Sequence, residues 1–269
     1  MSLLSSSLLD SCLHAVRQSG EIIRENWTRP HQVRHKGSID LVTETDLAVE
    51  DFLKDRLAGI LPEAGFMAEE SAVPDKAPGR LCWIIDPVDG TTNFVHRIPQ
   101  VGTSVALWHE GQVVLGIVNI PMLEECHWAV RGGGAFCNGE TVRVSEVGTL
   151  DSTLLATGFP YEAPRHLTTI MRRLEAALPV TQGLRRMGAA SVDLAYVACG
   201  RLDAFYEDWL KPWDLAAGWL LVEEAGGRVS NFRGERLGFY EPLLASNGAV
   251  HDALLELLQR ADGLSDLLP

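Results

Sequence analysis

One stretch decides the fold of this chain: Leu81-Cys82-Trp83-Ile84-Ile85-Asp86-Pro87-Val88-Asp89-Gly90-Thr91-Thr92-Asn93-Phe94. Its first five residues are mostly apolar and end at Ile85, which predicts a buried strand. The polar residues that follow predict the turn at the strand's carboxyl end, which is where open α/β sheets hold their chemistry. We therefore expect an α/β protein whose functional site begins at Asp86.

The first part of this turn suits a metal ion. Asp86 and Asp89 leave it three residues apart, and Pro87 restrains the backbone between them. Two anions held this close favour a bound cation. The backbone carbonyl of Val88 adds a third hard oxygen, the ligand type that Mg²⁺ or Mn²⁺ prefers.

The second part suits a phosphate. Gly90 lets the backbone approach a ligand closely, and Thr91-Thr92-Asn93 is able to open a short helix whose free N–H groups face an anion. Taken alone, the fragment is also compatible with an ordinary turn whose carboxylates cap their own backbone. The spacing excludes an EF-hand loop, which needs oxygen ligands at alternate positions, and an aspartyl-phosphate phosphatase, which needs two Asp residues two apart.

Composition limits the class of protein. The 269 residues are 46% hydrophobic, which predicts a well-cored globular chain of one or two domains. The 23 basic and 36 acidic residues give a net charge of −13, which argues against nonspecific binding to nucleic acid or to anionic membranes. A small anionic substrate stays possible, because a bound divalent metal inverts the local charge.

The cysteines and the N-terminus predict a cytoplasmic protein. Five scattered cysteines form no C-x-x-C pair, so we expect reduced thiols and neither a disulfide framework nor a zinc site: Cys12, Cys82, Cys126, Cys137 and Cys199. Met1-Ser2-Leu3-Leu4 lacks the basic flank of a signal peptide. No stretch approaches the roughly 20 apolar residues of a membrane span.

The N-terminal part predicts two helices and a short strand. Apolar residues at helical spacing predict a helix from serines 5–7 to about Trp27, followed by a basic loop over residues 31–38. Thr43 and Asp46 resemble a capping pair at the start of a helix that runs to about Gly59. Helix capping is enough to account for both residues without any role in function. Residues 66–71 predict a short strand that ends in two carboxylates, of which Glu69 is the first. This carboxylate is either part of an exposed acidic turn or within reach of the same cation as Asp86.

The middle of the chain predicts strands over residues 101–107, 112–119 and 126–130. The glycines of residues 131–136 lack the Lys-Ser/Thr of a phosphate-binding loop, so they predict a hairpin.

The C-terminal part predicts a strand and turn over residues 153–160, helices over 164–178 and 188–199, and a strand over 201–206 that leads into Glu207 and Asp208. A further helix follows Lys211 and ends near Gly226, and a closing helix covers about 247–261. Asp214, in the first turn of its helix, is explained either by the helix dipole or by coordination of a second metal. No linker or repeat is visible, so residues 1–269 are expected to form a single domain, with halves of about 1–150 and 151–269 that share one active site.

Three ordered motifs together resemble the inositol monophosphatase family: Ala68-Glu69-Glu70-Ser71, Trp83 to Phe94, and Trp213-Asp214-Leu215-Ala216-Ala217-Gly218. Residues 40–46 and 156–160 also resemble its bacterial members, so the resemblance covers nearly the whole chain. It implies the layered α/β/α/β/α sandwich of the inositol monophosphatase and fructose bisphosphatase type, and a homodimer.

The resemblance also implies residue roles. Glu69, Asp86 and the Val88 carbonyl would hold one Mg²⁺, while Asp86, Asp89 and Asp214 would hold another, with two or three ions per site and Mn²⁺ as a substitute. Thr91, with Glu69 and with Thr43 and Asp46, would position the attacking water. The substrate would contact a further set: Gly90, Thr91, Thr92, Ala190, Glu207 and Asp214.

The implied activity is Mg²⁺-dependent hydrolysis of inositol monophosphate by direct attack of water, with inhibition by lithium. Gly158 and Phe159 stand where some animal members carry serines near the substrate, which leaves the sugar preference open. The alternatives are a phosphatase of another small phosphate (fructose bisphosphate, histidinol phosphate, or an adenosine or NADP phosphate) and a regulatory partner protein with the same fold.

Overall fold

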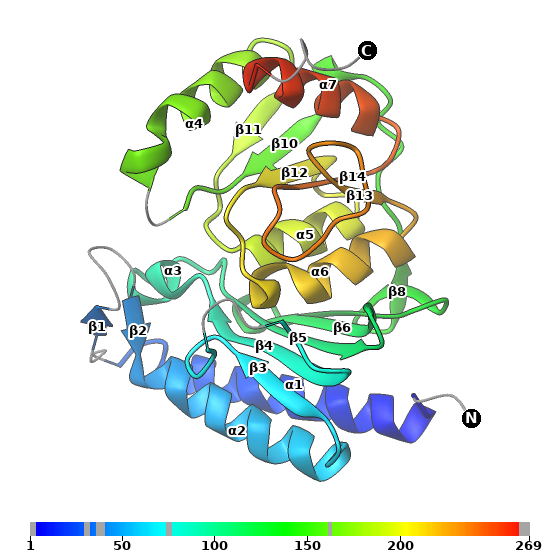
Figure 1. Cartoon of the computed structure of the whole chain (residues 1–269). Helices are drawn as coiled ribbons and strands as arrows, with labels where there is room; N and C mark the ends of the chain where they lie inside the picture. The colour runs from blue at the N-terminus through cyan, green and yellow to red at the C-terminus, as the bar shows by residue number, and fades with distance from the viewer. Residues whose placement is uncertain (1–3, 30–32, 36–40, 74–76, 161–162, 264–269) are drawn as a thin grey trace.

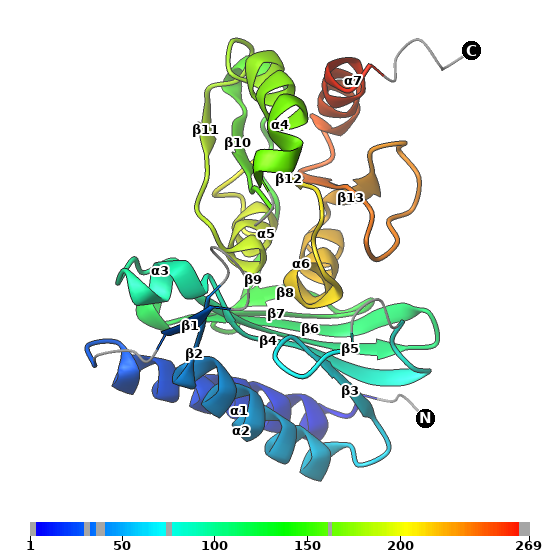
Figure 2. The same cartoon turned by 60° about the vertical axis from the view of Figure 1, so that its left-hand side comes forward.

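The computed structural model describes residues 4–29, 33–35, 41–73, 77–160 and 163–263. They form five layers (Figures 1 and 2): helices α1 (Ser6–Asn26) and α2 (Glu44–Ile60), a seven-stranded sheet, helices α5 (Ala190–Ala198) and α6 (Pro212–Glu224), a five-stranded sheet, and helices α4 (Ala163–Ala177) and α7 (His251–Ala261). The expected α/β/α/β/α sandwich is confirmed.

The larger sheet has the order β3-β4-β5-β6-β7-β8-β9. Only β3 and β4 run parallel, and the other neighbours are antiparallel. The strands are β3 (Gly65–Ala68), β4 (Leu81–Asp89), β5 (Gly102–His109), β6 (Gln112–Ile120), β7 (Glu125–Val130), β8 (Gly134–Cys137) and β9 (Glu140–Val142). The glycines of residues 131–136 lie at the β7–β8 hairpin, as predicted.

Strand β4 is longer than the sequence predicts. It does not end at Ile85 but continues to Asp89, with an irregular register between Asp86 and Asp89. Pro87 has no N–H to donate, and its carbonyl instead accepts a hydrogen bond from the Thr103 hydroxyl at 3.0 Å. Three of the expected metal ligands, Asp86, Val88 and Asp89, therefore lie on the last residues of the strand itself and not in a turn after it.

The smaller sheet has the order β11-β10-β12-β14-β13. Its strands are β10 (Leu154–Thr157), β11 (Gly183–Arg185), β12 (Ala204–Glu207), β13 (Arg228–Asn231) and β14 (Leu243–Ser246). The sequence pattern did not predict β11, β13 or β14, because each has only three or four residues and no clear alternation.

The N-terminal helices follow the capping signals. The Ser5 hydroxyl accepts from the Leu8 N–H at 3.2 Å at the start of α1, and Thr43 with Asp46 forms the predicted capping box of α2. Of the expected basic loop, the structure describes only Val33–His35, which is β1 and pairs with β2 (Leu41–Thr43); residues 31–32 and 36–38 lie outside the described residues.

The central helices α5 and α6 are buried on nearly every side, and this brings the two halves of the chain into one core. A Cβ atom on Gly116 of β6 would lie 2.6 Å from the Ala217 carbonyl oxygen, so α6 packs directly on the sheet. Within the residues that the structure describes, none of the helices combines the length and the apolar character that crossing a bilayer requires.

Candidate active site

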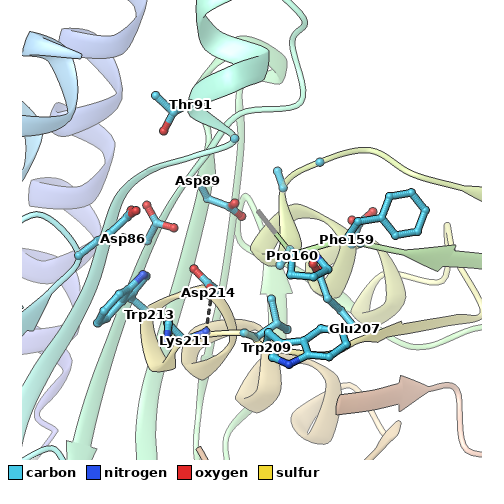
Figure 3. A pocket seen from close by; sticks show the side chains of 18 of the residues that line it. Asp86, Asp89, Thr91, Phe159, Pro160, Glu207, Trp209, Lys211, Trp213 and Asp214 are labelled. Atoms are coloured by element: carbon cyan, nitrogen blue, oxygen red, sulfur yellow. Dashed lines mark hydrogen bonds between the residues drawn. The ribbon is translucent and has the colours of Figure 1, made fainter. Parts of the chain in front are cut away.

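A pocket of about 910 Å³ opens where the larger sheet meets the N-terminal ends of α5 and α6 (Figure 3). It is lined by the end of β4, by the residues after β3 and β12, and by the first turns of both helices. The predicted metal and substrate residues therefore lie around one cavity: Glu69, Asp86, Val88, Asp89, Gly90, Thr91, Thr92, Ala190, Glu207 and Asp214.

Asp86 lies at the centre of the acidic group. The parallel register pairs Ala68 with Ile85, which places Glu69 beside Asp86. Asp86 is buried, and its pKa is raised well above the ordinary value, first by burial and then by the charges of Glu69, Asp89 and Asp214. The four carboxylates expected to meet do so.

Asp89 and Asp214 are held by the starts of α5 and α6. The Oδ2 atom of Asp89 accepts hydrogen bonds from the Ser191 N–H at 2.7 Å and from the Ser191 hydroxyl at 2.6 Å. Asp214 Oδ2 accepts from the Lys211 N–H at 2.7 Å, drawn as a dashed line in Figure 3. Burial and then Glu69 raise the pKa of Asp214 well above its usual value.

Thr91, in the short helix α3 (Thr91–Val95), connects the pocket to the start of α2. Its Oγ1 atom lies 3.0 Å from Asp46 Oδ1 and 3.0 Å from the Val88 carbonyl oxygen. The other oxygen of Asp46 accepts from the Thr43 N–H at 2.9 Å and from its hydroxyl at 2.5 Å. Thr43 and Asp46 thus stand behind Thr91 and reach the pocket through it. Burial raises the pKa of Asp46.

Glu207 projects into the opposite end of the pocket, near the aromatic rings of Phe159 and Trp209 (Figure 3). A Cβ atom on Gly158 would lie 1.8 Å from Glu207 Oε2, so this carboxylate occupies the space that any side chain at position 158 would need. Burial, followed by the charge of Asp193, raises the pKa of Glu207 well above its usual value.

Sequence reasoning missed Asp193, which lines the same pocket from α5. Both of its carboxylate oxygens are buried without a hydrogen-bond partner within the described ranges. The helical spacing was only a partial signal: it places Asp193 on the same face of α5 as Ala190, but it does not show that the carboxylate is buried. Arg186 and Lys211, which also line the pocket, were missed as its basic side chains.

Comparison with known proteins identifies the family. Residues 6–262 match the model of the inositol monophosphatase family. The chain belongs to that family. "Nus factor SuhB" of Escherichia coli K12 is 40% identical over 97% of this chain and 98% of its own length, and "Inositol-1-monophosphatase" of Mesorhizobium japonicum is 36% identical over 95% and 97%. The IMPase structure from Thermotoga maritima superposes with a TM-score of 0.87 at 35% identity and covers 95% of this chain and 98% of that one.

Members of the inositol monophosphatase family are metal-dependent phosphatases that act on small phosphorylated substrates. The residues of this chain fit such a metal. Glu69, Asp89 and Asp214 surround the buried Asp86 closely enough to raise its pKa, and a divalent cation is what such an anionic group needs. All of these donors are hard oxygens, as is the Val88 carbonyl, which suits Mg²⁺ or Mn²⁺.

Proposed function

We propose that this chain is a Mg²⁺-dependent phosphate monoester hydrolase whose substrate is inositol monophosphate. One observation carries the proposal: Asp86 lies among three other carboxylates in one pocket, and the four come from three segments of the chain, after β3, at the end of β4 and at the start of α6. Membership of the inositol monophosphatase family and the name of the Mesorhizobium relative support it.

Different residues of the pocket would have different roles. Glu69, Asp86, Asp89, Asp214 and the Val88 carbonyl would hold the metal ions. When bound, Mg²⁺ would neutralise the phosphate, lower the pKa of a water molecule and stabilise the departing alkoxide.

Glu69 and Thr91 would orient the attacking water. Thr91 contacts Asp46, whose pKa is raised by burial, so Asp46 is able to accept a proton that passes through the hydroxyl. The attack would be by water directly, with no phosphoenzyme: the Thr91 hydroxyl, which also contacts the Val88 carbonyl, would position the water and not attack the phosphorus itself.

The substrate alcohol would lie against Glu207 and Ala190. A carboxylate accepts paired hydrogen bonds from adjacent hydroxyl groups, which favours a polyol phosphate over a phosphate with an apolar alcohol. Gly90 and the N–H groups after it would approach the phosphate.

The test is to compare kcat/KM over a panel of phosphate monoesters, with and without Mg²⁺. We expect inositol monophosphate to be preferred over fructose bisphosphate, histidinol phosphate, and the adenosine and NADP phosphates. A preference for one of these would support the phosphatase assignment but replace inositol monophosphate as the substrate. No Mg²⁺-dependent hydrolysis of any of them would refute the proposal.

A second candidate function is regulatory. Relatives 40% identical to this chain carry the name Nus factor, so a role in which contacts with a partner protein outweigh turnover has support from them. The discriminating experiment asks whether an inactive Asp89 variant restores the phenotype of a deletion. Restoration favours the partner role, and failure favours catalysis.

We also propose that the chain is a cytoplasmic homodimer, by analogy with the family. Size-exclusion chromatography with light scattering measures the mass directly, and a monomer at micromolar concentration would contradict it.

A further inference from the structure

A second group of side chains with the chemistry to hold a metal ion lies on the β7–β8 hairpin, outside the residues that line the pocket. Figure 2 labels the two strands. Glu125 and His127 occupy alternate positions of β7, so their side chains share one face of the sheet. Cys137 of β8 stands directly opposite His127 in the antiparallel register. The backbone alone therefore brings a carboxylate, an imidazole and a thiol together.

The three side chains converge with the dimensions of a zinc site. One donor atom from each lies within 4.8 Å of the other two. His127 Nε2 lies 3.2 Å from Glu125 Oε2 and 3.7 Å from Cys137 Sγ. In a tetrahedral zinc site with ordinary bond lengths, the nitrogen and oxygen ligands are about 3.4 Å apart and the nitrogen and sulfur ligands about 3.6 Å apart. Both contacts are within hydrogen-bond distance, and it is the convergence of a carboxylate, an imidazole and a thiol that points to a metal.

The donor types also suit zinc, which takes imidazole nitrogen, thiolate sulfur and carboxylate oxygen as ligands. Burial lowers the pKa of His127 and raises the pKa of Cys137.

Arg201 holds the carboxylate in place. Its Nη1 and Nη2 atoms each donate to Glu125 at 2.7 Å, and its guanidinium lies 5.0 Å from the centre of the Tyr196 ring. A hydrogen-bonded clamp of this kind is what orients a metal-ligating carboxylate in known sites. The fourth position would be filled by water.

We propose that Glu125, His127 and Cys137 form a zinc-binding site. Arg201, three residues after the end of α5, binds Glu125, so the site lies near the C-terminal end of the helix whose first turn binds Asp89. Nine helical residues span about 14 Å, so the zinc would fix one end of the helix whose other end positions an active-site carboxylate. The proposal is independent of the phosphatase, because none of its three ligands lines the pocket. It also revises the expectation of no zinc site, which rested on the absence of a C-x-x-C pair.

Cobalt is the probe that separates this site from the pocket. The purified full chain is treated with chelator and titrated with Co²⁺ in excess Mg²⁺, which fills the oxygen-ligand site. Only a thiolate ligand gives sulfur-to-cobalt charge-transfer absorption. We expect this band to saturate at stoichiometric Co²⁺, to disappear when Zn²⁺ is added, and to be absent in Cys137→Ser.

Matched variants control the assignment. Cys126→Ser changes the neighbouring cysteine, which points to the opposite face of β7, and should keep the band. Arg201→Gln removes the clamp and should weaken Zn²⁺ binding about 10- to 100-fold. Circular dichroism confirms folding of each variant. A folded wild-type chain without the band, or a band that persists in Cys137→Ser, overturns the proposal.

Discussion

Asp89 on strand β4 is joined to Ser191, 102 residues later, by two hydrogen bonds to a single carboxylate oxygen, from the N–H at 2.7 Å and from the hydroxyl at 2.6 Å. The first half of the chain supplies the carboxylate and the second half supplies its donors. The geometry of the pocket therefore depends on α5 being docked against the larger sheet.

This relationship predicts the behaviour of Asp89→Asn. The amide oxygen is able to keep the Ser191 donors, so the fold should persist with a loss of about 1 kcal/mol or less. The charge needed for a divalent ion is gone, so Mg²⁺-dependent hydrolysis should fall to a trace. Circular dichroism and a phosphate-release assay measure the two effects. Near-normal turnover by the variant would refute the assignment of Asp89 as a metal ligand.

A second prediction concerns Gly158→Ala. The new Cβ would lie 1.8 Å from Glu207 Oε2, so the carboxylate must leave its position. We expect kcat/KM for inositol monophosphate to fall about 10-fold or more, through loss of hydrogen bonds to the alcohol. Turnover of an aryl phosphate without those hydroxyls should change little.

Gly148→Ala is the matched control for this substitution, since nothing lies within 4 Å of its Cβ position, and it should leave both rates unchanged. An equal loss of both substrates in Gly158→Ala would mean that Glu207 does not select the alcohol.

A third prediction tests the packing that holds the layers together. Gly116→Ala places a Cβ 2.6 Å from the Ala217 carbonyl oxygen, and backbone is unable to yield as a flexible side chain would. We expect α6 to be pushed from the sheet at a cost of about 1–3 kcal/mol in the free energy of unfolding. Urea denaturation measures it. Gly59→Ala, in α2 with open space around it, is the control and should leave stability unchanged or raise it slightly. A Gly116→Ala protein with an undiminished free energy of unfolding would contradict the close contact.

A fourth prediction is a loss of stability in mild acid. His251 is buried between the hydroxyls of Ser230 and Ser246, each 2.9 Å from a ring nitrogen, and burial lowers its pKa from 6.5 to about 4. Between these values the unfolded chain binds the proton and the folded chain does not, so stability falls as pH drops from 6.5 toward 4. The contribution at pH 5 is about 2 kcal/mol.

Urea denaturation at pH 7 and pH 5 measures this effect by comparison with His251→Gln, which has no titrating ring and should lose about 2 kcal/mol less across the same interval. Equal losses in the two proteins would show that His251 does not titrate as proposed.

Segments with a strong local sequence pattern were predicted correctly, and segments with a weak pattern were not. Long amphipathic or capped helices such as α1 and α2 were placed within a few residues of their observed ends. The strands β11, β13 and β14 form because neighbours pair with them, which their own three or four residues do not specify. The irregular end of β4 arises from pairing with β5, which a turn-like sequence does not reveal.

The site was more predictable than the sheet that carries it, because its carboxylates occur in motifs that resemble those of a known family. Asp193 is a different case. Its burial and its lack of a partner follow from how α5 lies against the end of β12, and no single-chain pattern states this. The same holds for Glu125, His127 and Cys137, which only the register of β7 and β8 brings together.

The most direct test of the central claim is phosphate release from inositol monophosphate by the metal-free chain as Mg²⁺ is added back. We predict no hydrolysis without the ion, saturable hydrolysis with it, and inhibition by Li⁺. Hydrolysis that proceeds equally well without divalent ions, or a folded chain that releases no phosphate at any Mg²⁺ or Mn²⁺ concentration, would contradict the account.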